Sequence, residues 1–318
     1  MEKNWERTLP FFYVDKKTIY SLFKGVIKDE QIVDINIINE GCRTSNYMIS
    51  TTTNDKYILK IFLDSEQQYI KECKILDLLK NNIPVQEVCR FEKSAKIDNK
   101  FYAIYKYLEG KTISRSLKNG YMISEETIRD AAIILAEIHK FKFYNVGFFD
   151  ENLCVRNCLK PLNEWYDEFT TEKVKNRIGI EAIQNIKLLI EDNIEDLLLM
   201  DKEPRLIHGD FQGTNILVDR NRICGIIDWE FAMAGHPLSD IGQFFRYEEY
   251  FHKDSIFIFE EEYRKKSDYI LPENWYKLSK IRDLANLIQL IGFEQDMPNK
   301  YSEVKSLILR TIEDYQKY

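Results

Sequence analysis

Three side chains with oxygen atoms stand at the ends of two apolar runs in the second half of the chain. Asp210 and Asn215 precede Ile216–Val218, and Asp228 follows Ile223–Ile227. The polar residues between the two runs favour a turn, so the runs are predicted to form a hairpin. That hairpin brings Asn215 and Asp228 to one end, where each offers an oxygen to a hard divalent cation such as Mg²⁺. Asp210 is expected beside the cation, free to receive a proton.

The order and spacing of these residues resemble a known fold family. His208-x-Asp210-x4-Asn215, followed by Asp228, resembles the catalytic loop and the metal-binding aspartate of the protein-kinase-like fold. The plain alternative is a buried hairpin in which the same Asp and Asn residues act as caps. Apolar strands seldom end in this set of groups unless a site requires it, which favours the resemblance.

Three features resemble the small-molecule branch of that fold, which holds the aminoglycoside phosphotransferases and the choline-kinase-like enzymes. Trp229-Glu230 follows the metal aspartate, and Gly209 replaces the arginine that reads a phosphorylated loop in many protein kinases. Only about a dozen residues separate Asp228 from Asp240, too few for an activation segment. Asp240 is expected to be structural, capping a helix and tying it to the catalytic loop.

The resemblance implies transfer of the γ-phosphoryl group of ATP or GTP to a hydroxyl of a small molecule. Asp210 would act as the catalytic base, and Asn215 and Asp228 would hold Mg²⁺. An aminoglycoside-type antibiotic is the expected phosphoryl acceptor, which implies a role in antibiotic resistance. Choline, an amino alcohol, another small metabolite and a macrolide stay open, as does a nucleotide-binding protein without turnover. The presence of all the chemical residues disfavours that last alternative.

Lys60 and Glu72 are two charged residues at positions predicted to be buried. Lys60 interrupts the apolar strand Tyr57–Leu63, and Glu72 shares a helix face with Leu76 and Leu79. An unpaired buried charge is costly, so we expect the two side chains to pair, leaving Lys60 directed at the nucleotide phosphates. The alternative is that Lys60 extends to the surface of an edge strand. The predicted helix begins near residue 66 with a Ser65–Gln68 capping box.

The resemblance also assigns a loop between the first two predicted strands to the nucleotide phosphates. Gly41 is the single glycine of this loop, unlike the glycine-rich loop of protein kinases. Backbone amides together with Thr44, Ser45 and Asn46 are therefore expected to bind phosphate.

A second nucleotide contact is expected where the strand 101–108 ends at Glu109-Gly110. The resemblance places a hinge between two lobes there, whose main chain contacts adenine. The candidates for this contact are Lys106, Tyr107 and Leu108.

Aromatic and acidic residues after the catalytic segment are the candidates for the phosphoryl-acceptor site. Glutamates beside aromatic rings suit a polyamine sugar or a quaternary ammonium group. A solvated acidic helix face explains the same composition equally well. A histidine at the end of a predicted helix, His139, is expected to be structural rather than catalytic. The acceptor candidates are Glu230, Tyr247, Glu248 and Glu249.

The strand and helix patterns predict an α+β fold with two lobes. The first lobe, residues 1–108, is expected to bind nucleotide with a five-stranded antiparallel sheet and one helix. The second lobe, residues 109–318, is expected to be mainly helical and to hold the catalytic and acceptor sites. Residues 1–30 are expected to be a helical lead-in. The predicted strands are 32–38, 46–50, 56–63, 85–91 and 101–108.

Composition narrows the classes of protein that fit. The 318 residues carry a net charge of −7, which argues against nucleic acid as a partner and suits a cationic small molecule. We see no apolar run long enough to span a membrane and no signal peptide, so we expect no membrane partner. The six cysteines are scattered without metal-finger spacing and fit reduced thiols. The expected location is the cytoplasm.

Overall fold

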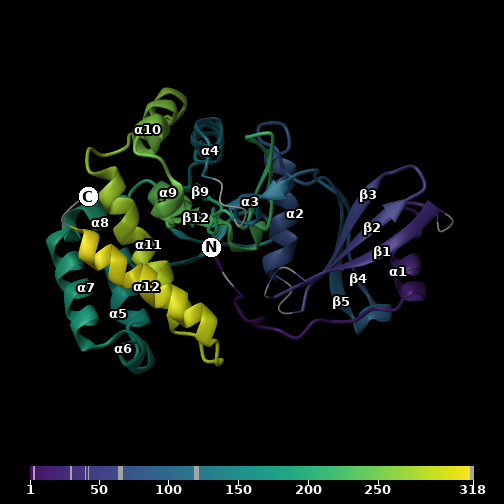
Figure 1. The fold of residues 1–318 in the computed structure, drawn as a ribbon, viewed down its shortest axis with the longest axis horizontal. Helices are drawn as coiled ribbons and strands as arrows, with labels where there is room; N and C mark the ends of the chain where they lie inside the picture. The colour runs from purple at the N-terminus through teal and green to yellow at the C-terminus, as the bar shows by residue number, and fades with distance from the viewer. Residues whose placement is uncertain are drawn as a thin grey trace.

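The computed structural model describes residues 1–2, 4–28, 31–39, 41, 43–63, 67–117 and 122–315. A five-stranded sheet with helix α1 (Lys16–Phe23) forms one part, and helices dominate the other. Helix α2 (Gln67–Leu79) lies between the two parts (Figure 1). This is the α+β arrangement that the sequence predicted. The expected capping box before α2 extends into residues that are not described.

The five-stranded sheet is antiparallel throughout, in the order β1-β2-β3-β5-β4. Lys60 lies opposite Asn46 on one neighbour and Ala103 on the other. Because side chains alternate between faces, Lys60 and Asn46 share one face, while Tyr47 and Leu59 share the other. The strands are β1 (Ile32–Ile38), β2 (Ser45–Thr51), β3 (Lys56–Ile61), β4 (Val88–Ser94) and β5 (Lys100–Lys106).

The fourth strand begins three residues later than the sequence predicted. Pro84 and Val85, expected just before and within it, contact the other part of the molecule instead. The Pro84 carbonyl accepts a hydrogen bond from the N–H of Ile226 (2.8 Å), and Val85 forms an isolated bridge with Ile226. This contact joins the sheet part to the predicted hairpin of residues 216–226.

The prediction of a helical lead-in over residues 1–30 was largely wrong. Among the described residues of this stretch, α1 alone is an α-helix, and Asp15 caps it as expected. The residues before it are extended because their backbone bonds to the sheet: Phe12 N–H donates to Ser45 Oγ, and Val14 N–H to Tyr47 Oη, both at 2.8 Å. From there the chain runs along the molecule to the helical part (Figure 1).

The remainder of the chain is mainly helical with short strands, as expected. The predicted hairpin is present as β10 (Ile216–Asp219) and β11 (Arg222–Ile226), joined by two residues with positive φ. The other strands are β6 (Lys111–Thr112), β7 (Gly147–Phe149), β8 (Val155–Cys158), β9 (Arg205–Ile207) and β12 (Met233–Gly235). The helices are α3 (Ile113–Leu117), α4 (Glu125–Ile138), α5 (Leu162–Phe169), α6 (Glu172–Ile178), α7 (Ile180–Asp192), α8 (Ile194–Met200), α9 (Pro237–Phe244), α10 (Ser255–Lys266), α11 (Trp275–Ile291) and α12 (Pro298–Asp314).

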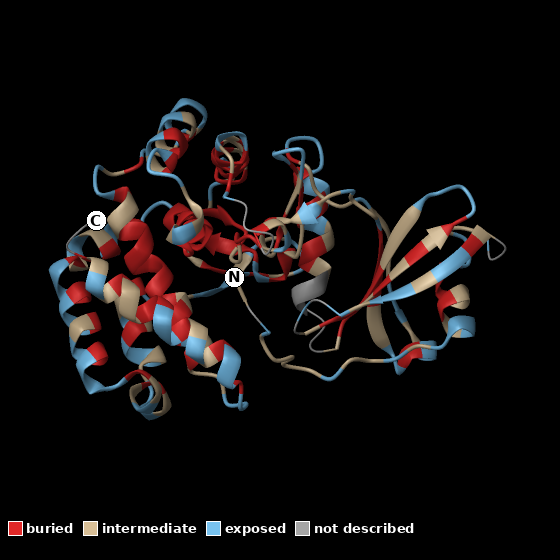
Figure 2. Ribbon diagram, viewed as in Figure 1, coloured by how far each residue is buried: buried red, intermediate tan, exposed pale blue. Residues whose placement is uncertain are grey.

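The apolar core is divided by the sheet. One cluster packs α1 against the outer face, around Phe23 and Tyr47. The larger cluster begins under the inner face with Phe62 and Tyr105 and continues through the helical part, where α9 and much of α11 are buried (Figure 2). Since α2 belongs to the larger cluster, burial of apolar surface fixes it to both parts.

Gly209, in the loop after β9, has a conformation that only glycine adopts easily. Its φ is +80°, and a Cβ atom there would lie 2.4 Å from the carbonyl oxygen of Phe231. The loop and the segment after β11 therefore approach each other more closely than a side chain would allow.

We expect Gly209→Ala to lower the free energy of unfolding by more than the roughly 1–3 kcal/mol that a strained backbone conformation alone costs. The matched control is Gly179→Ala, which shares a positive φ (+95°) but has open space around its Cβ position. Urea denaturation of both variants measures the difference. Equal losses would contradict a close approach at Gly209.

Candidate active site

A buried lysine stands at the centre of the candidate site. Lys60 on β3 is 6% exposed, and its Nζ lies 2.5 Å from Asp228 Oδ1 and 3.6 Å from Glu72 Oε1. The expected pair with Glu72 is therefore present, and Asp228 joins it. Burial opposes the charged form of Lys60, yet the negative charges of Asp228 and Glu72 outweigh it and raise its pKa.

Glu72 and its neighbour Lys71 attach α2 to the site. Glu72 is 1% exposed, and its Oε1 accepts a hydrogen bond from Tyr105 Oη (3.0 Å). Lys71 donates to the carbonyl of Ala232 (2.8 Å), four residues after Asp228 in sequence. Burial lowers the pKa of Lys71 to about 8. Two buried side chains of one helix thus reach both the sheet and the segment after β11.

Asp228 follows β11 in the left-handed backbone region, with φ +70°. Such a conformation is uncommon for a residue other than glycine and is concentrated at functional sites. Although burial acts against its charge, the Lys60 ammonium lowers the pKa of Asp228. Its carboxylate is therefore held ionised in a partly enclosed position.

Glu230, two residues later, lies on the Lys60 side of the site. It is 6% exposed, and burial followed by the charge of Asp228 raises its pKa to about 8. Its Oε2 has no hydrogen-bond partner among the described residues. Glu230 therefore lies beside the charged cluster of Lys60, Glu72 and Asp228. The sequence interpretation had placed it in the acceptor site.

The catalytic loop holds Asp210 and Asn215 in direct contact. Asn215 donates its Nδ2 to the Asp210 carboxylate Oδ2 (2.7 Å) and to the Asp210 carbonyl (2.9 Å). Both acceptors fix the amide orientation, so the Asn215 carbonyl oxygen is the atom left for a cation. Burial raises the pKa of Asp210. Among the described residues, no three His, Cys, Asp or Glu side chains are grouped to hold a metal.

Backbone amides of the catalytic loop are fixed by α9. The Asp240 carboxylate accepts from the N–H of His208 (2.7 Å) and of Gly209 (2.9 Å), which is the expected tie. The side-chain cap of α9 is His236, one turn earlier, so the capping part of the prediction for Asp240 was wrong. His139 is buried and bonds to Tyr263 Oη (2.7 Å), in keeping with a structural role.

The expected phosphate-binding side chains lie on different faces of β2. Asn46 lies opposite Lys60 and shares its face. Ser45 lies on the other face, and its Oγ accepts from Phe12 N–H, so the prediction that it binds phosphate does not fit. The Thr44 carbonyl accepts from Arg7 Nη2 (2.8 Å), while its hydroxyl lies 3.4 Å from Asn46 Oδ1.

The expected hinge has two of its three N–H donors already engaged. Lys106 N–H donates to the Glu87 carbonyl (3.0 Å), and Tyr107 N–H donates to the Lys56 carbonyl (2.9 Å). Of the three candidate N–H groups, these contacts leave that of Leu108 for a ligand.

Two expected acceptor-site glutamates are paired with cations of the C-terminal helices. Glu248 lies 2.5 Å from Lys280 on α11, and Glu249 lies 2.6 Å from Arg310 on α12. Their charges are thus countered, as in the alternative reading of a structural acidic face. Tyr247 is different because it is buried and donates its hydroxyl to Glu303 Oε1 (2.7 Å).

Three residues that the sequence interpretation missed lie beside Asp210. Gln212 Nε2 donates to Asp210 Oδ1 and to Glu2 Oε1, both at 2.8 Å, and Arg246 Nη1 donates to Gln212 Oε1 (3.0 Å). Arg246 is itself held by Asp283 through two hydrogen bonds. Gln212 lies within the recognised motif, but no local pattern connects Glu2 to a loop 208 residues away.

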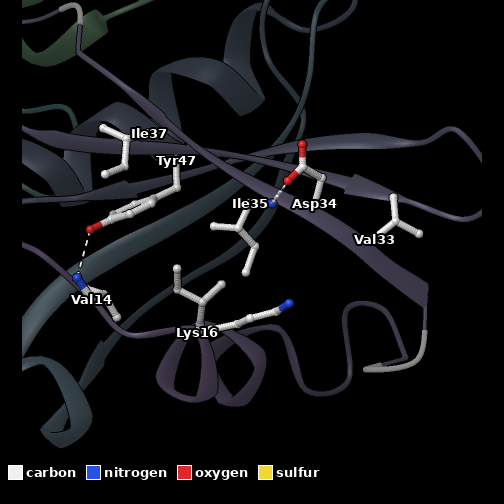
Figure 3. Close-up of a pocket in the computed structure, with 8 residues that line it drawn as sticks. Val14, Lys16, Val33, Asp34, Ile35, Ile37 and Tyr47 are labelled. Atoms are coloured by element: carbon white, nitrogen blue, oxygen red, sulfur yellow. Dashed lines mark hydrogen bonds between the residues drawn. The ribbon is translucent and has the colours of Figure 1, made fainter.

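A hollow of about 310 Å³ lies on the opposite face of the sheet from Lys60 (Figure 3). Val33, Ile35, Ile37 and Tyr47 line it, and Tyr47 uses its hydroxyl to hold Val14 N–H. Because it is mainly apolar and on the wrong face, it is not part of the candidate site.

These groups are the ones that the resemblance to the kinase-like fold predicted: a buried lysine between two carboxylates, and a loop that joins an aspartate to an asparagine. The model of the phosphotransferase enzyme family matches residues 34–259, and the chain belongs to this family.

Solved structures with the same fold are aminoglycoside phosphotransferases. A thermostable mutant of APH(4)-Ia in a ternary complex with AMP-PNP and hygromycin B has a TM-score of 0.68 and 13% identity, and covers 94% of this chain and 98% of its own. APH(2'')-Ib with ADP has a TM-score of 0.61 and 18% identity, and the match covers 95% of this chain and 99% of that one. A putative aminoglycoside phosphotransferase from Ralstonia eutropha has a TM-score of 0.66 and 13% identity, and the match covers 95% of this chain and 98% of that one. At these identities the likeness shows the fold, which confirms the two-lobed kinase-like prediction.

Curated relatives match part of the chain. Acyl-CoA dehydrogenase family member 11 of Pongo abelii is 26% identical over 152 residues, 46% of this chain and 19% of the relative. The human protein of the same name is 28% identical over 112 residues, which are 35% of this chain and 14% of the relative. The chain spans about a fifth or less of the length of these relatives. In the part of the chain that the structure describes, helices long and apolar enough to cross a membrane are absent.

The position of Glu2 gives a pH-dependent prediction. Burial and the charge of Asp210 raise the pKa of Glu2 from 4.5 to about 7, so the folded protein binds this proton more tightly than the unfolded chain. Stability from this group is therefore present at low pH and is lost as the pH rises from 4.5 through 7. We expect Glu2→Gln, which stays neutral, to have a higher Tm than the parent protein above pH 7 and an equal Tm below pH 4.5. A difference that does not change with pH would contradict this.

Proposed function

We propose that this protein transfers the γ-phosphoryl group of ATP or GTP to a hydroxyl of a small molecule. The observation that carries the proposal is the Lys60 ammonium held between Glu72 and Asp228, with Asp210 and Asn215 joined in the nearby loop. Stability alone does not explain a lysine buried in this way. Apolar residues in place of the buried ion pair would avoid the cost of removing its charges from water. The lysine has a chemical reason if phosphate oxygens bind beside it.

Each residue then has a definite role. Asp210 orients the acceptor hydroxyl and receives its proton, and Asn215 keeps the Asp210 carboxylate in position through its Nδ2. Lys60 steadies the phosphates, and Glu72 fixes its direction. Asn46, on the same face as Lys60, and the Leu108 N–H complete the nucleotide contacts. Positioning and charge neutralisation supply most of the rate enhancement in this chemistry.

The donor set fits Mg²⁺. Asn215 offers its carbonyl oxygen because both its N–H groups are engaged, and Asp228 offers a carboxylate held ionised by Lys60. Two protein oxygens are the usual contribution to a magnesium ion that also binds phosphates and water. The bound cation would neutralise charge on the transferring phosphoryl group.

An aminoglycoside-type antibiotic remains the preferred phosphoryl acceptor, which would make the protein a resistance enzyme in the cytoplasm. The support is the fold shared with aminoglycoside phosphotransferases, including one bound to hygromycin B. Choline, an amino alcohol, another metabolite and a macrolide are the alternatives, since the pairing of Glu248 and Glu249 weakens the argument for a polycation. We also propose that the boundary between the two lobes lies at residue 108.

A coupled ADP-release assay tests the function. It uses Mg-ATP and Mg-GTP against aminoglycosides, macrolides, choline, ethanolamine and amino sugars. Strong release with one class identifies the acceptor. Nucleotide binding without release in any reaction, including water alone, would favour a non-catalytic binding protein.

Asp210→Ala is expected to abolish phosphoryl transfer while nucleotide still binds, because the variant removes the proton acceptor and leaves Lys60 and Asp228 intact. The control is Asp219→Ala at the exposed hairpin end. ADP release and nucleotide titration by calorimetry measure the two properties. Near-normal turnover in the Asp210 variant would refute the assignment.

Lys60→Ala is expected to raise KM for the nucleotide at least tenfold, since the phosphates lose their cation. It also leaves two carboxylates without their counter-charge, so we expect a loss of about 3–5 kcal/mol of stability. Lys93→Ala on the edge strand β4 is the control for loss of a surface charge. Unchanged nucleotide kinetics in a folded Lys60 variant would mean that another lysine binds the phosphates.

A further inference from the structure

The first residues of the chain lie against the catalytic loop. Gln212 Nε2 donates to the carboxylates of both Asp210 and Glu2 at 2.8 Å, so these two carboxylates are neighbours around one donor. The Met1 side chain packs on Gly213, where its Sδ lies 2.5 Å from the position that a Cβ would occupy. In Figure 1 the N label stands at the middle of the helical part, near α9 and β12.

Contacts with the C-terminal helix α12 hold this segment in place. Glu303 Oε1 accepts from Glu2 N–H (2.7 Å), and Glu303 Oε2 accepts from Trp5 Nε1 (3.1 Å). Tyr247 donates to the same carboxylate. One residue further on, the Glu6 carboxylate accepts from the N–H of Asn299 at the start of α12 (2.9 Å).

The same segment also reaches the expected phosphate loop. Arg7 donates through Nη1 to the Gly41 carbonyl (2.5 Å) and through Nη2 to the Thr44 carbonyl (2.8 Å). The described residues 1, 2 and 4–7 therefore reach from the loop that holds Asp210 to the loop between β1 and β2. We call these residues the N-terminal strap.

Glu2 stands where an acceptor hydroxyl must approach. The hydroxyl has to come within about 3 Å of an Asp210 oxygen for proton transfer. Oδ2 of Asp210 is bound by Asn215, and Oδ1 shares the Gln212 amide with the Glu2 carboxylate. Arg246, which can only donate, binds the Gln212 oxygen and so fixes the amide nitrogen toward both carboxylates. An acceptor and Glu2 thus compete for the space in front of Asp210.

We propose that the N-terminal strap is an autoinhibitory element, in which Glu2 occupies the place of the phosphoryl acceptor until the acceptor displaces it. This inference rests on the proposed function, because it assigns Asp210 as the base. The strap and its anchor Glu303 both lie outside residues 34–259, the part that matches the family model.

The test compares ADP release in the absence of any acceptor, where water is the phosphoryl acceptor. Glu2→Ala removes the blocking carboxylate, and Glu303→Ala removes the anchor of the strap. We expect both variants to hydrolyse ATP roughly three- to tenfold faster than the parent protein, because the fraction of molecules with an open site rises. Glu191→Ala, an exposed glutamate of α7, is the matched control for loss of a negative charge. Adding Asp210→Ala to Glu2→Ala should abolish the gain.

Hydrogen exchange provides a readout that does not depend on turnover. With AMP-PNP bound, the peptide covering residues 208–215 should exchange faster in Glu2→Ala than in the parent protein, because Gly213 and Gln212 lose their cover. If the parent protein hydrolyses ATP, unchanged or slower hydrolysis in both strap variants would overturn the proposal, and so would unchanged exchange of this peptide. If no variant hydrolyses ATP but the exchange rises, the strap covers the loop and the proposed phosphotransferase function is what fails.

Discussion

A buried ammonium is the constraint on which the site depends. Lys60 lies between the buried residues Leu59 and Ile61 of β3 and is itself 6% exposed, so water does little to solvate its charge. It is stable only because Glu72 comes from α2 and Asp228 from the end of β11. Those two elements belong to different parts of the molecule, so satisfying one charge requires the sheet, the helix and the hairpin to meet.

The loop that carries Asp210 is held largely through its backbone, which side chains of α9 bind. Asp240 and Gln243 of α9 bind its amides and the Gly209 carbonyl, and Gly209 lets it approach Phe231. A loop fixed in this way keeps Asp210 in one place without using the Asp210 carboxylate for structure. The carboxylate is then engaged mainly by amides, which hold its direction and can give way to a hydroxyl.

The predictions that were wrong share one physical reason. The spacing of residues along the chain does not tell which groups of other elements will contact them. Ser45 stands beside Asn46 in sequence, yet strand alternation sends it to the other face, where Phe12 binds it. Glu248 and Glu249 have the composition of a cation site, but Lys280 and Arg310 are supplied by later helices. Val85 was predicted to lie in a strand of the sheet, but it and Pro84 contact the hairpin instead.

The sequence by itself determined the fold class, the hairpin with its polar ends and the pairing of Lys60 with Glu72. These features follow from local periodicity and from the cost of burying a charge, both of which can be read along the chain. Tertiary structure alone decided that Asp228 completes the pair, that Arg246 orients Gln212, and that Glu2 lies beside Asp210. Those contacts join residues from 34 to 210 positions apart, and the packing of separate elements brings them together without any local pattern.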